Sequence, residues 1–219
     1  MYAPDASKPG KDDRRSAILE IARAAFLQDG YSGTSMSQIA ARVGGSKATL
    51  YNYFPSKKEL FLAVADAMCT EKLISLFDVG EMTGGIRKAL ADFIRRFLPM
   101  LLAEDVVAFY RLVVAESGRF PEIGRELYEI GPSRGIKRMA EYFEQAIETG
   151  EIRKIDTVAA AEQFLDLCAG PLNRKQLWNV DVDMSSERLE MHIERIVTTF
   201  LAAYGNDAIS QAARVAAIR

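Results

Sequence analysis

The sequence predicts an all-α protein in which a three-helix N-terminal head is joined by a helix to a larger helical body. Two observations lead to this fold class. Apolar residues recur every three or four positions along almost the whole chain, and no stretch of alternating β-branched residues competes with them. Glycines separate the helical stretches, and glycine commonly ends a helix. The body is expected to consist of helices at 56–77, 84–103, 105–117, 121–129, 132–149, 157–178 and 185–204.

The composition is that of a globular protein rather than a disordered or membrane-embedded one. Of 219 residues, 49% are hydrophobic and 26% are charged, which is the usual balance of a folded domain. No apolar run reaches the ~18 residues that a membrane span needs, and the polar N-terminus lacks the apolar core of a secretory signal. The two cysteines, Cys69 and Cys168, are too few for a disulfide framework and indicate a reducing compartment. We therefore expect a cytoplasmic protein with no membrane partner.

The charge is distributed unevenly along the chain. Residues 1–60 contain nine Lys or Arg and six acids, whereas the remainder contains 19 basic and 24 acidic residues. A basic head on an acidic body is typical of a nucleic-acid-binding module joined to another domain. A chance excess of three charges would look the same, so the charge alone decides nothing.

The first expected helix has its apolar residues, from Ile18 to Phe26, on one face, and Gly30 is placed to end it. Residues 1–13 are expected to form a disordered tail, and residues 206–219 a C-terminal tail. Basic side chains near the N-terminus could reach a DNA groove beside the head; these are Lys8, Lys11, Arg14 and Arg15.

Residues 35–54 predict two short helices joined by a glycine turn. Ser35 is placed to cap the first helix, with Gln38 completing a capping box. Gly44-Gly45 permits a sharp turn, Ser46 can cap the second helix, and Pro55 prevents its continuation. Helices this short are unstable alone, so they must pack against their neighbours. This is the helix-turn-helix plan, in which the second helix enters the major groove of DNA.

The second of these helices has an outward face suited to DNA. Leu50 and Phe54 share the inner face, four residues apart. Lysine and tyrosine can reach phosphates, while threonine and asparagine can contact base edges. The alternative is that the tyrosines are half-buried packing residues. The side chains left to face outward are Lys47, Thr49, Tyr51, Asn52 and Tyr53.

Residues 14–62, which contain ILEIARAAFLQDGYSGTSMSQIAARVGGSKATLYNYFPSKKELF, resemble the TetR family of bacterial transcriptional regulators. The resemblance assigns residues 14–60 to a helix-turn-helix DNA-binding domain. Two departures stand out, Gly45 where the family often has valine and Ala48 where it often has glycine. By resemblance, the DNA contacts are Ser37, Lys47, Thr49, Tyr51, Asn52, Tyr53 and Lys57.

The body, residues 61–205, resembles the AefR-like C-terminal subgroup of that family, through FYRLVVAESGRFPEIGRELYEIGPSR at 109–134. The resemblance implies an inducer pocket in the middle helices and a homodimer formed by the helices at 157–178 and 185–204. Apolar stripes support a four-helix interface, although an ordinary intramolecular core would produce the same stripes. The stripes contain Ala160, Ala161, Phe164, Leu165, Leu167, Cys168 and Leu172, then Leu189, Ile193, Ile196, Val197, Phe200, Leu201 and Tyr204.

Aromatic residues between 90 and 180 suit a pocket for a moderately apolar small-molecule effector. We expect a minority of them to line a cavity and the rest to form core. The candidate ligand-binding residues are Phe109, Arg111, Glu116, Tyr128, Tyr142 and Trp178.

Catalysis is not expected, because the sequence lacks H-E-x-x-H, G-x-x-x-x-G-K-S/T, G-x-G-x-x-G and paired Cys-x-x-Cys motifs. The single histidine, His192, has no metal-binding partner at helical spacing and is read as a packing or interface residue. No cofactor or metal is predicted. Two functions remain open. One is a ligand-responsive repressor that binds palindromic operator DNA as a homodimer; the other is a small-molecule carrier or scavenger with a vestigial head.

Overall fold

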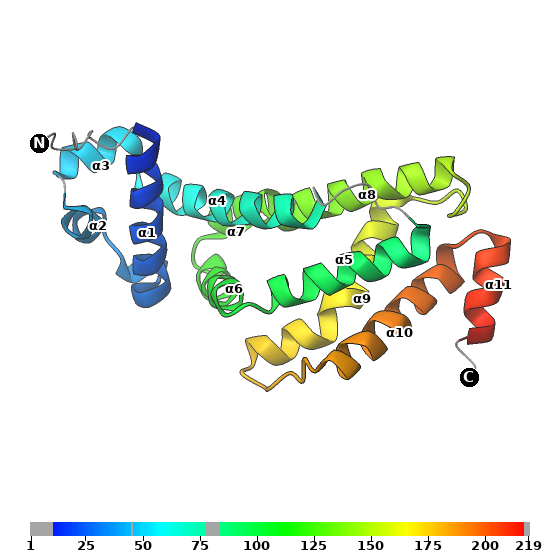
Figure 1. The fold of residues 1–219 in the computed structure, drawn as a ribbon. Helices are drawn as coiled ribbons and strands as arrows, with labels where there is room; N and C mark the ends of the chain where they lie inside the picture. The colour runs from blue at the N-terminus through cyan, green and yellow to red at the C-terminus, as the bar shows by residue number, and fades with distance from the viewer. Residues whose placement is uncertain (1–10, 45, 78–83, 217–219) are drawn as a thin grey trace, which may run out of the picture. The chain divides into compact units, whose positions relative to one another are not determined.

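The computed structural model describes residues 11–44, 46–77 and 84–216, and over these residues the fold is all-α, as the sequence predicts (Figure 1). Outside the helices, Ile152 and Gly205 form an isolated β-bridge. In chain order the helices are α1 (Lys11–Gly33), α2 (Met36–Val43), α3 (Lys47–Tyr53), α4 (Lys57–Phe77), α5 (Ile86–Leu101), α6 (Glu104–Ser117), α7 (Pro121–Ile130), α8 (Pro132–Glu148), α9 (Thr157–Leu177), α10 (Ser186–Tyr204) and α11 (Asp207–Ala216).

The chain divides into two compact units, which we call the head and the body. Among the described residues, the head contains everything up to Cys69 together with Leu112–Tyr128. The body contains Thr70–Arg111 and the chain from Glu129 onward. The sequence places the boundary at residue 60, so the head contains more of the chain than expected. Helices α4, α6 and α7 each begin in one unit and end in the other.

The head has a small aromatic core. Phe26 of α1 and Phe61 of α4 are fully buried and meet edge to face, with ring centroids 4.9 Å apart. Helix α1 begins at Lys11, inside the segment expected to be a disordered tail, and its first turn contains Asp12 and Asp13. Acidic side chains stabilise the positive end of a helix dipole, which explains the earlier start. Residues 1–10 lie outside the described residues.

The body is built around four phenylalanines, one from each of α5, α8, α9 and α10. Phe143 and Phe200 stack with ring centroids 5.0 Å apart, and Phe164 meets Phe200 edge to face at 5.0 Å. Phe93 lies 5.9 Å from Phe164. All four rings are at most 1% exposed, so they form the centre of the body's core.

The C-terminal segment expected to be a tail contains α11, which packs on α10. The Ser210 hydroxyl donates to the backbone oxygens of Leu201 at 3.1 Å and Gly205 at 2.8 Å. Ala213 is fully buried. The Leu201 oxygen also accepts from the backbone N–H of Gly205, so the Ser210 hydroxyl adds a second bond there and binds α11 to the end of α10.

The apolar stripes expected to form a dimer interface are largely the core of a single chain. On α10 the buried residues include Ile193, Ile196, Val197, Phe200 and Leu201, and on α9 they include Ala160, Ala161, Phe164 and Cys168, each at most 3% exposed. These residues therefore fit the alternative that the stripes form an ordinary intramolecular core. A partner chain would have to use the outer faces of the same helices.

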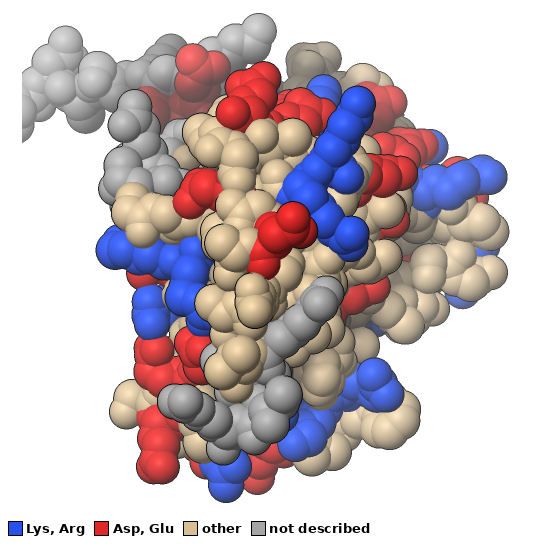
Figure 2. All heavy atoms as spheres, turned by 90° about the vertical axis from the view of Figure 1, so that its right-hand side faces the viewer, with Lys and Arg blue, Asp and Glu red and all other residues tan. Residues whose placement is uncertain are grey.

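Figure 2 shows the end of the body at which α11 lies. The basic side chains in view are interspersed with acidic ones rather than gathered into one patch. Since DNA-binding surfaces concentrate Lys and Arg, this face does not have the character of one.

Candidate nucleic-acid interface

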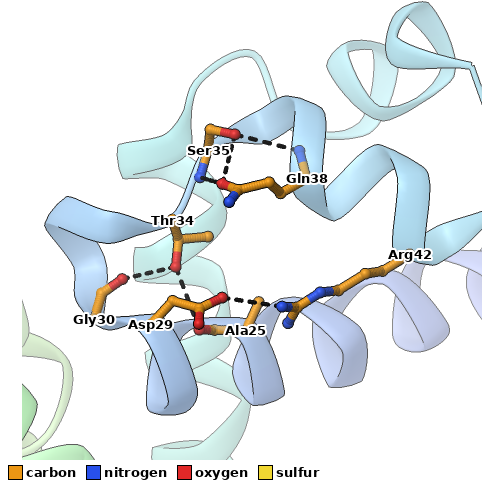
Figure 3. A network of polar contacts seen from close by, with 7 residues as sticks. All are labelled: Ala25, Asp29, Gly30, Thr34, Ser35, Gln38 and Arg42. Atoms are coloured by element: carbon orange, nitrogen blue, oxygen red, sulfur yellow. Dashed lines mark hydrogen bonds and ion pairs between the residues drawn. The ribbon is translucent and has the colours of Figure 1, made fainter.

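Helix α2 begins with the capping box that the sequence predicts (Figure 3). The backbone N–H of Ser35 donates to Gln38 Oε1 at 2.8 Å, and the backbone N–H of Gln38 donates to Ser35 Oγ at 3.3 Å. At the other end, Gly44 has a φ of 71°, in the left-handed region that glycine adopts at low cost. Both ends of this eight-residue helix are therefore fixed by local chemistry.

The connection between α1 and α2 is fixed by a second set of polar contacts (Figure 3). The Thr34 hydroxyl lies 2.7 Å from the backbone oxygen of Gly30 and 3.3 Å from that of Ala25. Arg42 of α2 forms an ion pair with Asp29 of α1 at 3.0 Å. Because Thr34 is buried, its bonds to the end of α1 hold the angle at which α2 leaves.

Helix α3 has the inner face that the sequence predicts. Ser46 caps it by accepting from the backbone N–H of Thr49 at 3.1 Å. Leu50 and Phe54 are 2% and 3% exposed. These anchors orient the rest of the helix outward. Gly45, the departure noted in the turn, lies outside the described residues.

The outer face of α3 exposes three of the five side chains predicted there. Lys47, Tyr51 and Asn52 are exposed, with Tyr51 at 42%. Thr49 and Tyr53 are half-buried, and the hydroxyl of Thr49 lies 2.9 Å from that of Ser46. The alternative of a half-buried tyrosine thus describes Tyr53 but not Tyr51. We call Lys47, Tyr51 and Asn52 the recognition face.

Two further predicted contacts lie on α2 and α4. Ser37 is exposed. Lys57 instead bonds within the head: its Nζ donates to the backbone oxygens of Tyr31 at 2.7 Å and Thr34 at 2.9 Å. It also lies 4.4 Å from the centroid of the Tyr31 ring, and burial lowers its pKa. Lys57 therefore holds the end of α1, and its contact with phosphate stays a prediction.

A set of contacts from the segment that contains α6, Phe120 and α7, which we call the clasp, joins that segment to the end of α1 and to the start of α4. Glu116 of α6 accepts from the backbone N–H of Ser32 at 3.0 Å and from the Ser32 hydroxyl at 2.7 Å. The rings of Tyr31 and Phe120 meet edge to face at 5.2 Å. Lys58 and Glu126 form an ion pair at 2.5 Å. The clasp explains why Leu112–Tyr128 belongs to the head.

Glu116 was expected in an effector pocket, and the structure places it in the clasp instead. Burial alone would raise the pKa of Glu116, but the hydrogen bonds from Ser32 and the charges of Arg119 and Lys57 outweigh it and hold the pKa below its usual value. Sequence reasoning missed this role because Ser32 and Glu116 are far apart in the chain. In the sequence, the only sign of this role is that Glu116 is an acidic residue within an apolar helix.

The other candidate ligand-binding residues are divided between the two units of the chain. Tyr128 belongs to the head, and Trp178 is 74% exposed. Arg111 donates to the backbone oxygen of Gln176 and to Asn179 Oδ1, the latter at 3.2 Å. Tyr142 is half-buried, and burial together with the charge of Glu151 raises its pKa to about 12.

Pockets in the described parts of the body include one of about 480 Å³ and one of about 320 Å³, and neither of these is lined by Phe109 or any other of the six candidates. The smaller pocket lies between α4 and α8 and is lined by Thr70, Leu73, Ile74, Arg134, Lys137, Arg138 and Glu141. The effector site expected among the aromatic residues stays a prediction.

Among the described residues, no group of three or more His, Cys, Asp or Glu is arranged to hold a metal ion. None of the described helices is both long enough and apolar enough to span a membrane. Burial raises the pKa of the Cys168 thiol, which disfavours the reactive thiolate.

Two short capped helices, a buried inner face and an exposed polar outer face define a helix-turn-helix DNA-binding module. Residues 18–64 match the family described as "Bacterial regulatory proteins, tetR family", and residues 88–206 match "AefR-like transcriptional repressor, C-terminal domain". The second match alone covers more than half of the chain. The chain belongs to the TetR family of DNA-binding transcriptional regulators, a family whose members are not enzymes.

Solved structures and curated relatives agree with this family. The flavonoid-responsive regulator FrrA is 36% identical, with 89% of this chain and 98% of that one covered and a TM-score of 0.80. A TetR-family regulator from Mesorhizobium loti is 28% identical, with 90% and 100% covered and a TM-score of 0.79. The transcriptional activator FasR of Mycolicibacterium smegmatis is 38% identical over 80 residues, which are 36% of this chain and 32% of FasR. The chain thus spans about a third of FasR.

Proposed function

We propose that the chain is a ligand-responsive repressor, which binds palindromic operator DNA as a homodimer in the cytoplasm and is released by a small-molecule effector. The observation that carries the proposal is the recognition face. Lys47, Tyr51 and Asn52 are exposed on a helix whose inner face is fixed by Leu50 and Phe54. A carrier or scavenger would not need such a face, and no observation favours that alternative.

The recognition face offers chemistry for both positioning and sequence reading. The Lys47 ammonium suits a phosphate or a guanine edge, and the Asn52 amide can pair with adenine. The Tyr51 hydroxyl suits a phosphate oxygen. Ser37, Thr49 and Tyr53 would add contacts at its margin. Lys57 would add a phosphate contact only while its Nζ kept its bonds to the backbone oxygens of Tyr31 and Thr34.

Homodimer formation would use the outer faces of α9 and α10. On α9, Val158 and Leu167 are 52% and 38% exposed, on opposite sides of the helix, and on α10 Met191 is 50% exposed. Apolar side chains left exposed on adjacent helices favour a protein partner. A two-fold axis would repeat the recognition face, and a palindromic operator requires the two copies to lie roughly 34–36 Å apart.

Effector response and repression rest on the relatives. FrrA is by name flavonoid-responsive, and the C-terminal match is to a family described as a repressor domain. We propose a moderately apolar, aromatic effector. Helix α6 supplies a route for its signal, because Arg111 at its middle belongs to the body and Glu116, one turn later, to the head. A coupling free energy of about 1–3 kcal/mol would be ordinary for such a regulator.

The proposal is tested by fluorescence anisotropy with a duplex from the region upstream of the chain's own gene, beside a scrambled duplex. We expect the native duplex to bind at least ~10³-fold more tightly, with two protomers per duplex by analytical ultracentrifugation. Adding naringenin, as a representative flavonoid, tests the effector class and should weaken binding by roughly 5- to 150-fold.

The outcomes separate the parts of the proposal. Equal, weak binding to both duplexes would contradict sequence-specific regulation by this operator and favour the carrier. Tight binding that naringenin does not weaken would contradict the effector class alone. One protomer per duplex would contradict the homodimer.

A further inference from the structure

Arg15, near the start of α1, lies against the end of the recognition helix α3. Its guanidinium carbon is 5.3 Å from the centroid of the Phe54 ring, within the ~6 Å over which an aromatic face attracts a cation. Phe54 directly follows α3 and is only 3% exposed. Figure 1 shows the first turns of α1, in the darkest blue, beside α3. A buried ring thus holds the Arg15 guanidinium at one end of the recognition helix.

The N–H groups of Arg15 are available to a partner outside the chain. The residue is exposed, and no carboxylate of the described residues forms an ion pair with it. A guanidinium has five N–H donors and no acceptor, so its natural partner is an anion. Asp12 and Asp13, in the first turn of α1, are also exposed, and their charges oppose an anion nearby. An anion bound here must therefore touch the guanidinium directly.

The position of Arg15 fits the DNA backbone when α3 lies in the major groove. In helix-turn-helix complexes the N-terminal residues of the recognition helix contact base edges, so its C-terminal end lies nearer the edge of the groove. The groove is roughly 12 Å wide and is bordered by phosphates. Asn52 of the recognition face is two residues before Phe54, which is about 3 Å along a helix axis. A cation over the Phe54 ring is therefore close to the recognition face and on its phosphate side.

The neighbouring cation, Lys57, has less to offer a phosphate. Two of its three N–H groups donate to the backbone oxygens of Tyr31 and Thr34, at 2.7 and 2.9 Å. At most one N–H group is left over. Arg15 has no such bonds to give up, and a planar guanidinium can donate two parallel hydrogen bonds to one phosphate.

We propose that Arg15 binds a phosphate of the DNA backbone beside the groove that α3 enters, and that the Phe54 ring positions its guanidinium for this contact. The family match begins at residue 18, so it assigns no role to Arg15. A phosphate contact fixes the register of the protein on DNA and adds affinity without reading sequence. The inference rests on the DNA binding of the proposed function, and it does not depend on which sequence is the operator.

The test is a fluorescence-anisotropy titration of the full-length protein with the upstream duplex and with its scrambled counterpart, at several salt concentrations. The variants are Arg15→Gln, which removes the charge, and Arg15→Lys, which keeps it. The control is Arg23→Gln, on the same helix, because Arg23 pairs with Glu20 at 4.0 Å. Circular dichroism and sedimentation establish that each variant stays folded and keeps its oligomeric state.

We expect Arg15→Gln to weaken binding to both duplexes by about tenfold for each bound protomer, since a charge-assisted hydrogen bond is lost. The salt slope should fall by about one per protomer, and the ratio of the two affinities should stay at its wild-type value. Arg15→Lys should keep the wild-type slope, because the slope counts neutralised phosphates. Arg23→Gln should bind as the wild type does.

Three results for Arg15→Gln would overturn the proposal. Wild-type affinity and slope would show that Arg15 does not contact DNA. Weaker binding with an unchanged slope would show that Arg15 acts only by packing on Phe54. A lower ratio of operator to scrambled affinity would show that it reads a base. Equal, weak binding of the wild type to both duplexes would contradict the proposed operator alone, because the slopes still test Arg15; no binding to either duplex would overturn both.

Discussion

The head and the body differ in what determines their geometry. In the head, polar side chains at helix ends fix the arrangement: Ser35 and Ser46 cap α2 and α3, and Thr34 bonds to the end of α1. In the body, packed rings such as Phe143 and Phe200 do so. Capping is local and can be read from residues three apart, whereas ring packing joins distant helices. The function of the head can therefore be predicted from its sequence, whereas the function of the body cannot.

The largest expected effect is on the body's core. Phe143→Ala removes a fully buried ring that stacks on Phe200. We expect the free energy of unfolding to fall by about 3–5 kcal/mol, measured by urea denaturation followed through Trp178 emission. A loss below about 1 kcal/mol would show that the aromatic cluster is not what stabilises the body.

The clasp gives a smaller effect with a defined pH dependence. Glu116→Gln keeps the shape of the side chain but removes the negative charge of the carboxylate, whose oxygens accept hydrogen bonds from Ser32. We expect a loss of about 1 kcal/mol near neutral pH. Because the pKa of Glu116 is lowered in the folded protein, its contribution is present above the unfolded pKa of about 4.3 and is lost as the pH falls through the folded pKa.

The measurement is urea denaturation of the wild type and Glu116→Gln between neutral pH and pH 3. The two stabilities should converge at the acid end. Glu122→Gln, on an exposed glutamate of α7, serves as the control and should change little. A difference between wild type and Glu116→Gln that persists undiminished at the lowest pH would show that the carboxylate's charge is not the cause.

A pair of serines on α2 separates folding from recognition. Ser35→Ala removes the cap and should cost about 1 kcal/mol of stability. Ser37→Ala, two residues later on an exposed position, should leave the unfolding midpoint unchanged and weaken operator binding in the anisotropy titration. If Ser37→Ala binds operator as the wild type does, Ser37 is not a DNA contact.

Features fixed by neighbouring residues could be predicted from the sequence, whereas features fixed by contacts between distant helices could not. The helix ends at Ser35, Gly44 and Ser46 follow from residue chemistry within one turn, and each prediction is confirmed. The stripes of α9 and α10 could not be assigned, because an apolar face looks the same whether it meets its own chain or a partner. The contacts that Glu116 and Lys57 make within the head could not be foreseen either, because their partners at the end of α1 are brought close only by the fold.

Helix α11 lies in the segment 206–219, which was expected to be a tail. The Ser210 hydroxyl donates to the backbone oxygens of Leu201 and Gly205 near the end of α10. These contacts depend on how α11 packs on α10, so they could not be read from the residues of the segment alone.

The central claim is that the recognition face reads DNA sequence. The most direct test compares affinities for operator and scrambled duplexes, across several salt concentrations, for the wild type, Asn52→Ala and Lys47→Ala. We predict that Asn52→Ala lowers the ratio of the two affinities about tenfold or more. Lys47→Ala, as a phosphate contact, should weaken both duplexes and reduce the salt slope by about one. If both variants keep the wild-type ratio of operator to scrambled-duplex affinity and the wild-type salt slope, the assignment of α3 as the recognition helix is contradicted.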